Sequence, residues 1–318
     1  MALTRTRAMP TTPPPAGRRR PGLLASIARA RADYAYVGPA ILVMLLVIGY
    51  PLVYTIYLSF FDTPPRSGDW VWTGFGNYGD VLGSDRFWRT TRNTLYWTFG
   101  STGIAMVLGF GAALVVNRKF PGRGIVRAIL LIPWVISHVA TAYVFRWFLH
   151  SDYGLFGGTM VDWGLADRRP VLLDSVDWVM PAVIMVNVWK EFPFVMIMVL
   201  AGLQTVPDHL MRAAKMDGAG AFQQFRHVIV PHLRGVIMIT TLLLFVTNLN
   251  SFTLVYLLTG GGPAGASQLW ITEIYNTAFR TFRYGEASAY SVILFLIMLS
   301  MGYFYVKALS GGSRRRPT

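Results

Sequence analysis

The 318-residue sequence contains no cysteine, which excludes disulfide bonds, thiol nucleophiles and cysteine-ligated metal sites. Charged residues are also scarce, at 14%, whereas hydrophobic residues make up 53%. The mean hydropathy of +0.44 is too high for an ordinary soluble protein. These values indicate a protein that crosses a membrane several times and leave no room for a second soluble domain.

Sequence motifs for catalysis are missing as well. The chain has no G-x-x-x-x-G-K-[ST] phosphate loop, no H-E-x-x-H and no G-x-S-x-G. Its five histidines lack the spacing of metal ligands, and only His138 falls inside an apolar segment. We therefore expect no enzymatic activity, no metal and no bound cofactor from this chain alone.

Six apolar segments are long enough to cross a bilayer, which takes about 20 residues of helix. They predict an all-α membrane protein with spans at about 34–61, 93–117, 128–149, 178–203, 235–258 and 287–306. Residues 1–22 are rich in Pro, Thr and Arg and predict a disordered tail. The body of the protein is expected at 23–309, followed by a basic tail at 310–318.

The basic residues are unevenly distributed between the two sides of these spans. Nineteen Lys and Arg residues lie before the first span, after the last span, in the 118–127 turn and in the 207–234 segment, against eight in the other loops. Because cytoplasmic loops carry the excess of Lys and Arg, both termini are predicted to be cytoplasmic. This topology also explains the net charge of +14 without nucleic acid, which we do not expect as a partner.

Residues 207–234, called here the coupling segment, form the longest basic insert between two apolar segments. Asp208 is expected to cap a helix that Gly218 and Gly220 end, and a second short helix is expected to stop at Pro231. The pattern predicts two helices joined at an angle. A simpler interpretation is a loop whose positive charges only hold it in the cytoplasm.

Polar residues in the fourth and fifth spans mark a candidate binding site, since buried polar groups in a membrane are costly. In each span they repeat at i, i+3, i+4 and i+7 and so share one helix face. Amide, hydroxyl and aromatic groups together suit a sugar, although polar residues in spans also join helices. The candidate substrate-binding residues are Asn187, Lys190, Glu191, Phe194, Leu244, Thr247, Asn248 and Ser251, with His138 and Thr141 from the third span.

The motif R-A-A-K-M-D-G-A (212–219), followed after eight residues by V-I-V-P (228–231), resembles the EAA loop of binding-protein-dependent ABC importer permeases. Further stretches are similar to maltose-type sugar permeases, among them NVWKEFPF (187–194), AGLQTVP (201–207) and LLTGGGP (257–263). The last is typical of the first of their two permease subunits. Arg212 departs from the pattern, because the family usually has glutamate there.

The resemblance implies a sugar-importing permease in the cytoplasmic (inner) cell membrane, whose alternating access is driven by a separate ATPase. Its implied partners are a second six-span permease, a cytosolic ATPase homodimer that binds ATP and Mg, and an extracytoplasmic sugar-binding protein. In that family the EAA loop inserts into the ATPase, so the implied ATPase-coupling residues are Arg212, Ala213, Ala214, Asp217, Gly218, Ala219 and Pro231.

Two alternatives remain at this point. One is an importer of the same architecture for a phosphorylated polyol such as glycerol phosphate, with Lys190 as the cation. The other is a secondary transporter driven by protons or sodium, with Glu191 as the coupling carboxylate. In the sugar importer, Asn187, Glu191 and Asn248 are expected to contact sugar, whereas Lys190 is expected to pair with a carboxylate.

Overall fold

A computed structural model describes residues 35–64 and 69–313, and the predicted tail at 1–22 lies outside these residues. The chain divides into two compact units, Met1–Tyr54 and Thr55–Thr318. The described part of the first unit is a single apolar helix, which continues to Leu58. It contains a π-helical turn, η1 (Leu45–Gly49), directly before α2 (Tyr50–Leu58). The wide turn fits Pro51, because a proline lacks the N–H of a regular helix and its ring clashes with the preceding turn.

After the end of α2, the second unit forms a small β-hairpin, which the prediction of an all-α protein missed. Strands β1 (Phe61–Asp62) and β2 (Val71–Trp72) pair antiparallel, with Phe61 opposite Trp72. Phe60 stacks on Trp72 beside this pair. Strands of two residues are too short for a period-2 pattern to reveal in a sequence.

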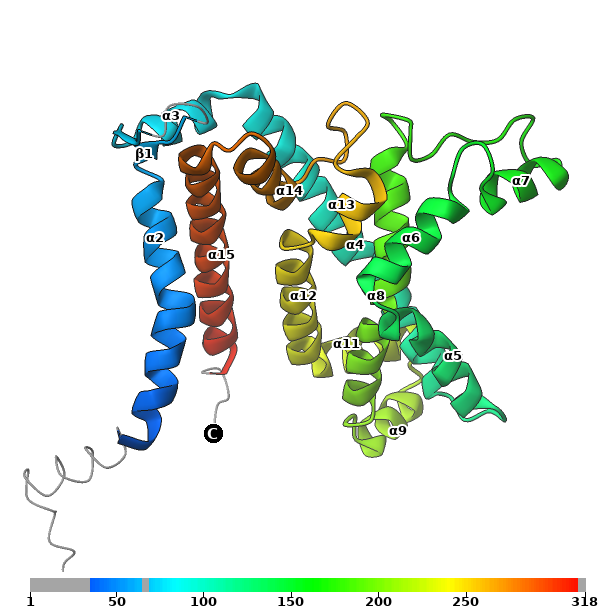
Figure 1. Ribbon diagram of the computed structural model, residues 1–318. Helices are drawn as coiled ribbons and strands as arrows, with labels where there is room; N and C mark the ends of the chain where they lie inside the picture. The colour runs from blue at the N-terminus through cyan, green and yellow to red at the C-terminus, as the bar shows by residue number, and fades with distance from the viewer. Residues whose placement is uncertain (1–34, 65–68, 314–318) are drawn as a thin grey trace, which may run out of the picture. The chain divides into compact units, whose positions relative to one another are not determined.

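The remainder of the second unit is helical (Figure 1). Its helices are α3 (Gly76–Gly83), α4 (Asp85–Asn117), α5 (Arg123–Val135), α6 (His138–Phe148), α7 (Leu155–Asp162), α8 (Val179–Leu203), α9 (Asp208–Met216), α10 (Ala221–Gln224), η2 (Phe225–Ile229), α11 (Val230–His232), α12 (Arg234–Leu249), α13 (Thr253–Thr259), α14 (Trp270–Tyr275), η3 (Asn276–Arg280) and α15 (Tyr284–Ser313). The expected C-terminal tail at 310–318 therefore begins inside α15.

Helix α8 is the centre of the second unit and packs along α4. The two backbones approach closely at Gly109, where an added Cβ would lie 2.4 Å from the Cβ of Val195. Small residues permit such close packing between membrane helices. Trp97 on α4 and Val183 and Val199 on α8 belong to the same hydrophobic core and are completely buried.

Four helices of the described chain are long and apolar enough to cross a membrane, or up to six if each bent helix pair counts as one span. The expected single span at 128–149 is instead α5 and α6, which meet at 94°. The expected span at 235–258 is interrupted after Leu249, and α13 follows the break. Hydropathy detects both apolar segments but carries no information about these breaks, which depend on Ser137 as the N-cap of α6 and on the polar residues after Leu249.

Candidate substrate site and coupling segment

A buried polar cluster joins α4, α8 and α12. The Asn187 side chain donates from Nδ2 to Asn248 Oδ1 at 2.8 Å. Asn248 in turn donates from Nδ2 to Glu191 Oε2 at 3.1 Å and to Thr102 Oγ1 at 3.2 Å. All four side chains are buried, so each hydrogen bond replaces one that water would otherwise supply.

Helix periodicity explains how the cluster forms. Asn187 and Glu191 are four residues apart and therefore lie on one face of α8. On α12 the carbonyl of Asn248 accepts a hydrogen bond from Trp97 Nε1 at 3.0 Å, which helps to fix the position of α12 along α4. The sequence prediction found three members of the cluster and missed Thr102. The sequence does contain a signal for Thr102, because Thr94, Thr98 and Thr102 follow one another at intervals of about one helical turn in an apolar span.

Lys190 points away from this cluster and is buried. Its Nζ donates to the backbone carbonyls of Pro133, at 3.5 Å, and of Ile136. These carbonyls lie where α5 ends and the chain turns into α6, so they need donors from outside the helix. Lys190 was expected to pair with a carboxylate, but its partners in this structure are backbone carbonyls. The sequence could not show this, because it does not reveal the helix break that places free carbonyls within reach of Lys190.

A pocket of about 250 Å³ opens beside Lys190 and Glu191. Trp134 and Phe194 form an aromatic wall, with ring centroids 6.1 Å apart and 24° between the ring planes. The arrangement can stack an apolar ring face and hydrogen-bond its substituents. The pocket is lined by Trp134, His138, Lys190, Glu191, Phe194, Leu243, Leu244 and Thr247.

A second pocket, of about 410 Å³, shares His138 and Thr247 with the first. It extends along the break after α12 and includes the predicted residue Ser251. Three other predicted residues line neither pocket: Asn187 and Asn248 are turned to each other, and Thr141 donates to the Ser137 carbonyl at 3.0 Å. Trp134 and Leu243 line the first pocket but were not predicted.

The coupling segment forms the two predicted helices and the sharp turn between them. Gly218 has a φ of +77°, in the left-handed region. Its N–H donates to the Lys215 carbonyl at 3.1 Å, and the N–H of Ala219 donates to the Ala214 carbonyl at 2.9 Å. These two bonds make a Schellman cap at the end of α9. The Asp-Gly-Ala motif is therefore a helix C-cap, followed by a new helix that Gly220 begins.

Two details of the predicted segment are wrong. The N-cap of α9 is Pro207, and Asp208 is the first residue of the helix. Pro231 does not end the second helix but lies within α11, directly after the π-helical turn η2. A π turn leaves space for the proline ring where a regular helix would clash with it.

Side chains of the coupling segment remain largely open to solvent. Arg212, Ala213, Asp217 and Gly218 are exposed, and no residue of α9 is buried. Met216 is 88% exposed and Phe222 71%, which is unusual for apolar side chains of this size. Neither here nor elsewhere among the described residues do three or more His, Asp or Glu side chains gather as metal ligands.

Comparison with known proteins places this geometry in a family. Residues 105–311 match the family model described as a binding-protein-dependent transport system inner membrane component. The chain is 32% identical over 287 residues to the trehalose/maltose transport system permease protein MalF of Thermococcus litoralis, covering 87% of this chain and 93% of that protein. It is 33% identical over 289 residues to the trehalose transport system permease protein SugA of Mycobacterium tuberculosis, covering 88% and 89%.

The fold is also that of a solved transporter. A bacterial ABC transporter involved in the import of the acidic polysaccharide alginate superposes with a TM-score of 0.75 at 24% identity, covering 90% of this chain and 98% of that one. The family match and the apolar helices together make the protein a multi-pass membrane protein. Because the family model matches more than half of the sequence, this chain belongs to the binding-protein-dependent inner membrane components, the permeases of ABC transporters.

Proposed function

We propose that this chain is the permease subunit of an ATP-driven, binding-protein-dependent importer of sugars, of disaccharide to oligosaccharide size. The observation that carries the proposal is the pocket beside the buried polar cluster, which combines the Trp134–Phe194 wall with polar groups. Aromatic faces stack on sugar rings, and amides and carboxylates bind hydroxyl groups. The names of the trehalose and maltose permeases among its relatives support the same class of substrate.

The proposal includes six spans, cytoplasmic termini and a place in the inner cell membrane. Alternating access of the pocket would be driven by a partner ATPase pair that binds ATP and Mg, since this chain has no phosphate loop. The exposed apolar side chains Met216 and Phe222 support the coupling segment as the docking site for that ATPase. A second permease would complete the pathway, and an extracytoplasmic binding protein would deliver the sugar.

The polar contacts argue against the two alternatives. Lys190 uses two of its three N–H donors on the carbonyls of Pro133 and Ile136. Glu191 lines the same pocket, and its carboxylate opposes a phosphorylated substrate. A secondary transporter driven by Glu191 would have no use for the capped, exposed helix pair of the coupling segment.

Uptake by the reconstituted complex tests the proposal. Proteoliposomes holding this chain, its partner permease and the ATPase should accumulate labelled trehalose or maltose only with ATP and a binding protein. ATP depletion under a clamped ion gradient should stop uptake, and the chain purified alone should not hydrolyse ATP. Uptake that persists without ATP would contradict the proposal.

A pair of phenylalanine variants tests the pocket itself. Phe194→Ala removes one side of the aromatic wall and should raise the KM for sugar. The matched control is Phe99→Ala on α4, since Phe99 is 62% exposed and lies outside both substrate pockets. Equal effects of the two variants on KM would show that the wall does not contact the sugar.

A further inference from the structure

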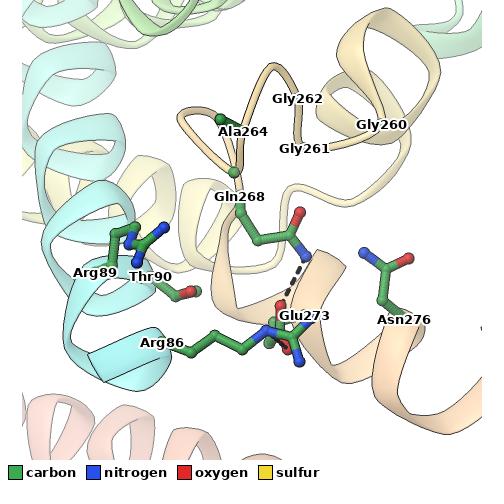
Figure 2. A pocket seen from close by; sticks show the side chains of 11 residues that line it. Arg86, Arg89, Thr90, Gly260, Gly261, Gly262, Ala264, Gln268, Glu273 and Asn276 are labelled. Atoms are coloured by element: carbon green, nitrogen blue, oxygen red, sulfur yellow. Dashed lines mark hydrogen bonds and ion pairs between the residues drawn. The ribbon is translucent and has the colours of Figure 1, made fainter. Parts of the chain in front are cut away.

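A third pocket, of about 370 Å³, lies at the end of the second unit where α4 begins. Figure 1 shows that α9 lies at the opposite end of α4 and α8. None of the residues of this pocket lines either substrate pocket. It is formed by Arg86, Arg89, Thr90, Gly260, Gly261, Gly262, Ala264, Gly265, Gln268, Glu273 and Asn276 (Figure 2).

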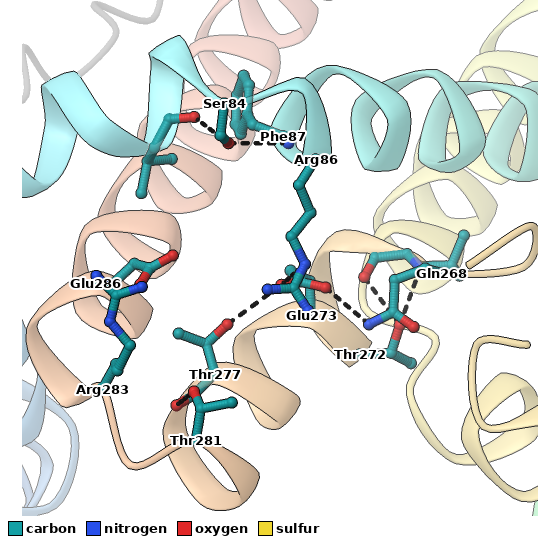
Figure 3. Close-up of polar contacts among 12 residues, drawn as sticks. Ser84, Arg86, Phe87, Gln268, Thr272, Glu273, Thr277, Thr281, Arg283 and Glu286 are labelled. Carbon is teal, nitrogen blue, oxygen red and sulfur yellow. Dashed lines mark hydrogen bonds and ion pairs between the residues drawn. The ribbon is translucent and has the colours of Figure 1, made fainter. Parts of the chain in front are cut away.

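Glu273 supplies the negative charge of this third pocket, and its carboxylate is fully engaged. Arg86 Nε contacts Glu273 Oε1 at 2.8 Å, and Gln268 Nε2 donates to Oε2 at 2.9 Å. Thr277 Oγ1 donates to Oε1 at 3.3 Å (Figure 3). Since Glu273 is 0% exposed, this carboxylate serves as an internal partner for Arg86 and is closed to a ligand.

Arg89 is the second cation of the pocket, and Glu273 does not pair with it. It lies three residues after Arg86, on the same side of α4, and its side chain is exposed. Among the described residues it has no hydrogen bond or ion pair, and in Figure 2 no dashed line reaches it. With two guanidinium groups against one carboxylate, the pocket carries a net positive charge.

The glycine-rich loop adds backbone donors to the same pocket. Ala264 and Gly265 both have positive φ, +47° and +75°. Their N–H groups have no acceptor within the described part of the chain. Consecutive N–H groups without acceptors in a turn are available as donors to an anion. Asn276 also lines the pocket, and its buried Oδ1 has no hydrogen-bond partner in the described structure.

From these contacts we infer that the third pocket binds a carboxylate, supplied by an Asp or Glu side chain of the extracytoplasmic solute-binding protein. A planar guanidinium matches the geometry of a carboxylate, and the residues of the two free N–H groups line the same pocket. Arg89 is exposed, so a side chain of a docking protein can reach it. A partner at this end of the protein approaches from the side opposite the coupling segment. The inference rests on the proposed function for the existence of such a partner.

Binding of the solute-binding protein to the assembled complex in nanodiscs tests the inference. The probe is the binding protein that supports uptake in the proteoliposomes. Arg89→Glu should weaken its binding by about tenfold, because a charge-reversed contact opposes the acidic partner. Arg89→Lys should keep most of the affinity, and the effect of Arg89→Glu should shrink above about 0.5 M salt.

Arg92→Glu is the matched control, since Arg92 is exposed, lies on the same helix and lines a different pocket. Basal ATPase activity and yield should be unchanged in all three variants. Changing the contacting acid of the binding protein to Arg should restore binding to Arg89→Glu.

Equal binding by the Arg89→Glu and Arg92→Glu complexes would overturn the inference. Unchanged binding together with selective loss of uptake of a carboxylated sugar such as a glucuronide would also overturn it, and would assign the pocket to substrate. If the unmodified complex responds to no binding protein, the proposed function fails and this inference fails with it.

Discussion

Asn187 on α8 and Asn248 on α12 are hydrogen-bonded to each other at 2.8 Å and are almost completely buried. In this conformation the two amides therefore hold helices together and line neither substrate pocket. Glu191, the third member, reaches both the cluster and the first pocket. The cluster is thus placed so that a substrate at Glu191 can affect the packing of α8 against α12.

Asn248→Ala should destabilise the complex more than Asn187→Ala. The first change removes three side-chain hydrogen bonds, among them the one to the Glu191 carboxylate, and a hydrogen bond to a charged group is worth more than a neutral one. The second removes one neutral hydrogen bond and costs about 1–3 kcal/mol. The apparent unfolding temperature and the yield of the assembled complex measure the difference. The reverse order would mean that Glu191 does not depend on Asn248.

Lys190→Met should loosen the junction between α5 and α6, because methionine has similar bulk but no donor for the carbonyls of Pro133 and Ile136. The absence of native cysteine allows a single cysteine to be introduced at Ser137, within the junction, as a clean probe. Its reaction with a maleimide should be faster in the Lys190→Met background. A cysteine at Ser84, the partly exposed N-cap of α4, is the control, and its labelling rate should not change if the effect is local.

Sequence periodicity predicted the common face of Asn187 and Glu191, and apolar length predicted the four long apolar helices. The Asp-Gly-Ala turn was also predictable, because the left-handed residue at a helix C-terminus is usually glycine. The Lys190 contacts were not predictable, because they depend on the 94° bend between α5 and α6, which brings carbonyls 57 and 54 residues away to its amine. The pocket around Arg89 was missed because α4, the glycine-rich loop and η3 meet only in the fold.

Gly218→Ala should weaken the coupling segment, whereas Gly220→Ala should be tolerated. No atom lies within 4 Å of an added Cβ at Gly218, so the cost comes only from its φ of +77°. A left-handed alanine costs about 1–2 kcal/mol. Gly220 has a φ of −66°, which alanine adopts freely. Copurification of the ATPase and sugar-stimulated ATP hydrolysis should fall only in the Gly218 variant. Equal behaviour of the two variants would show that the Schellman cap is unimportant for coupling.

Gly109→Ala should be among the most damaging single changes in the described core. An added Cβ there would lie 2.4 Å from Val195 Cβ and 2.6 Å from the backbone oxygen of Phe192, so α4 and α8 would have to separate. Overpacking of this kind costs about 1–3 kcal/mol or more. Gly111, two residues along the same helix, has no atom within 4 Å of an added Cβ and provides the matched control.

Separation of α4 from α8 would also disturb the polar cluster, because Thr102 on α4 accepts from Asn248. The Gly109→Ala complex should therefore show both a lower unfolding temperature and reduced uptake per assembled complex. Gly111→Ala should match the unmodified complex in both measurements, since alanine is at least as favourable as glycine in a helix. A Gly109→Ala complex of normal stability would mean that the two helices pack less closely than the structure shows.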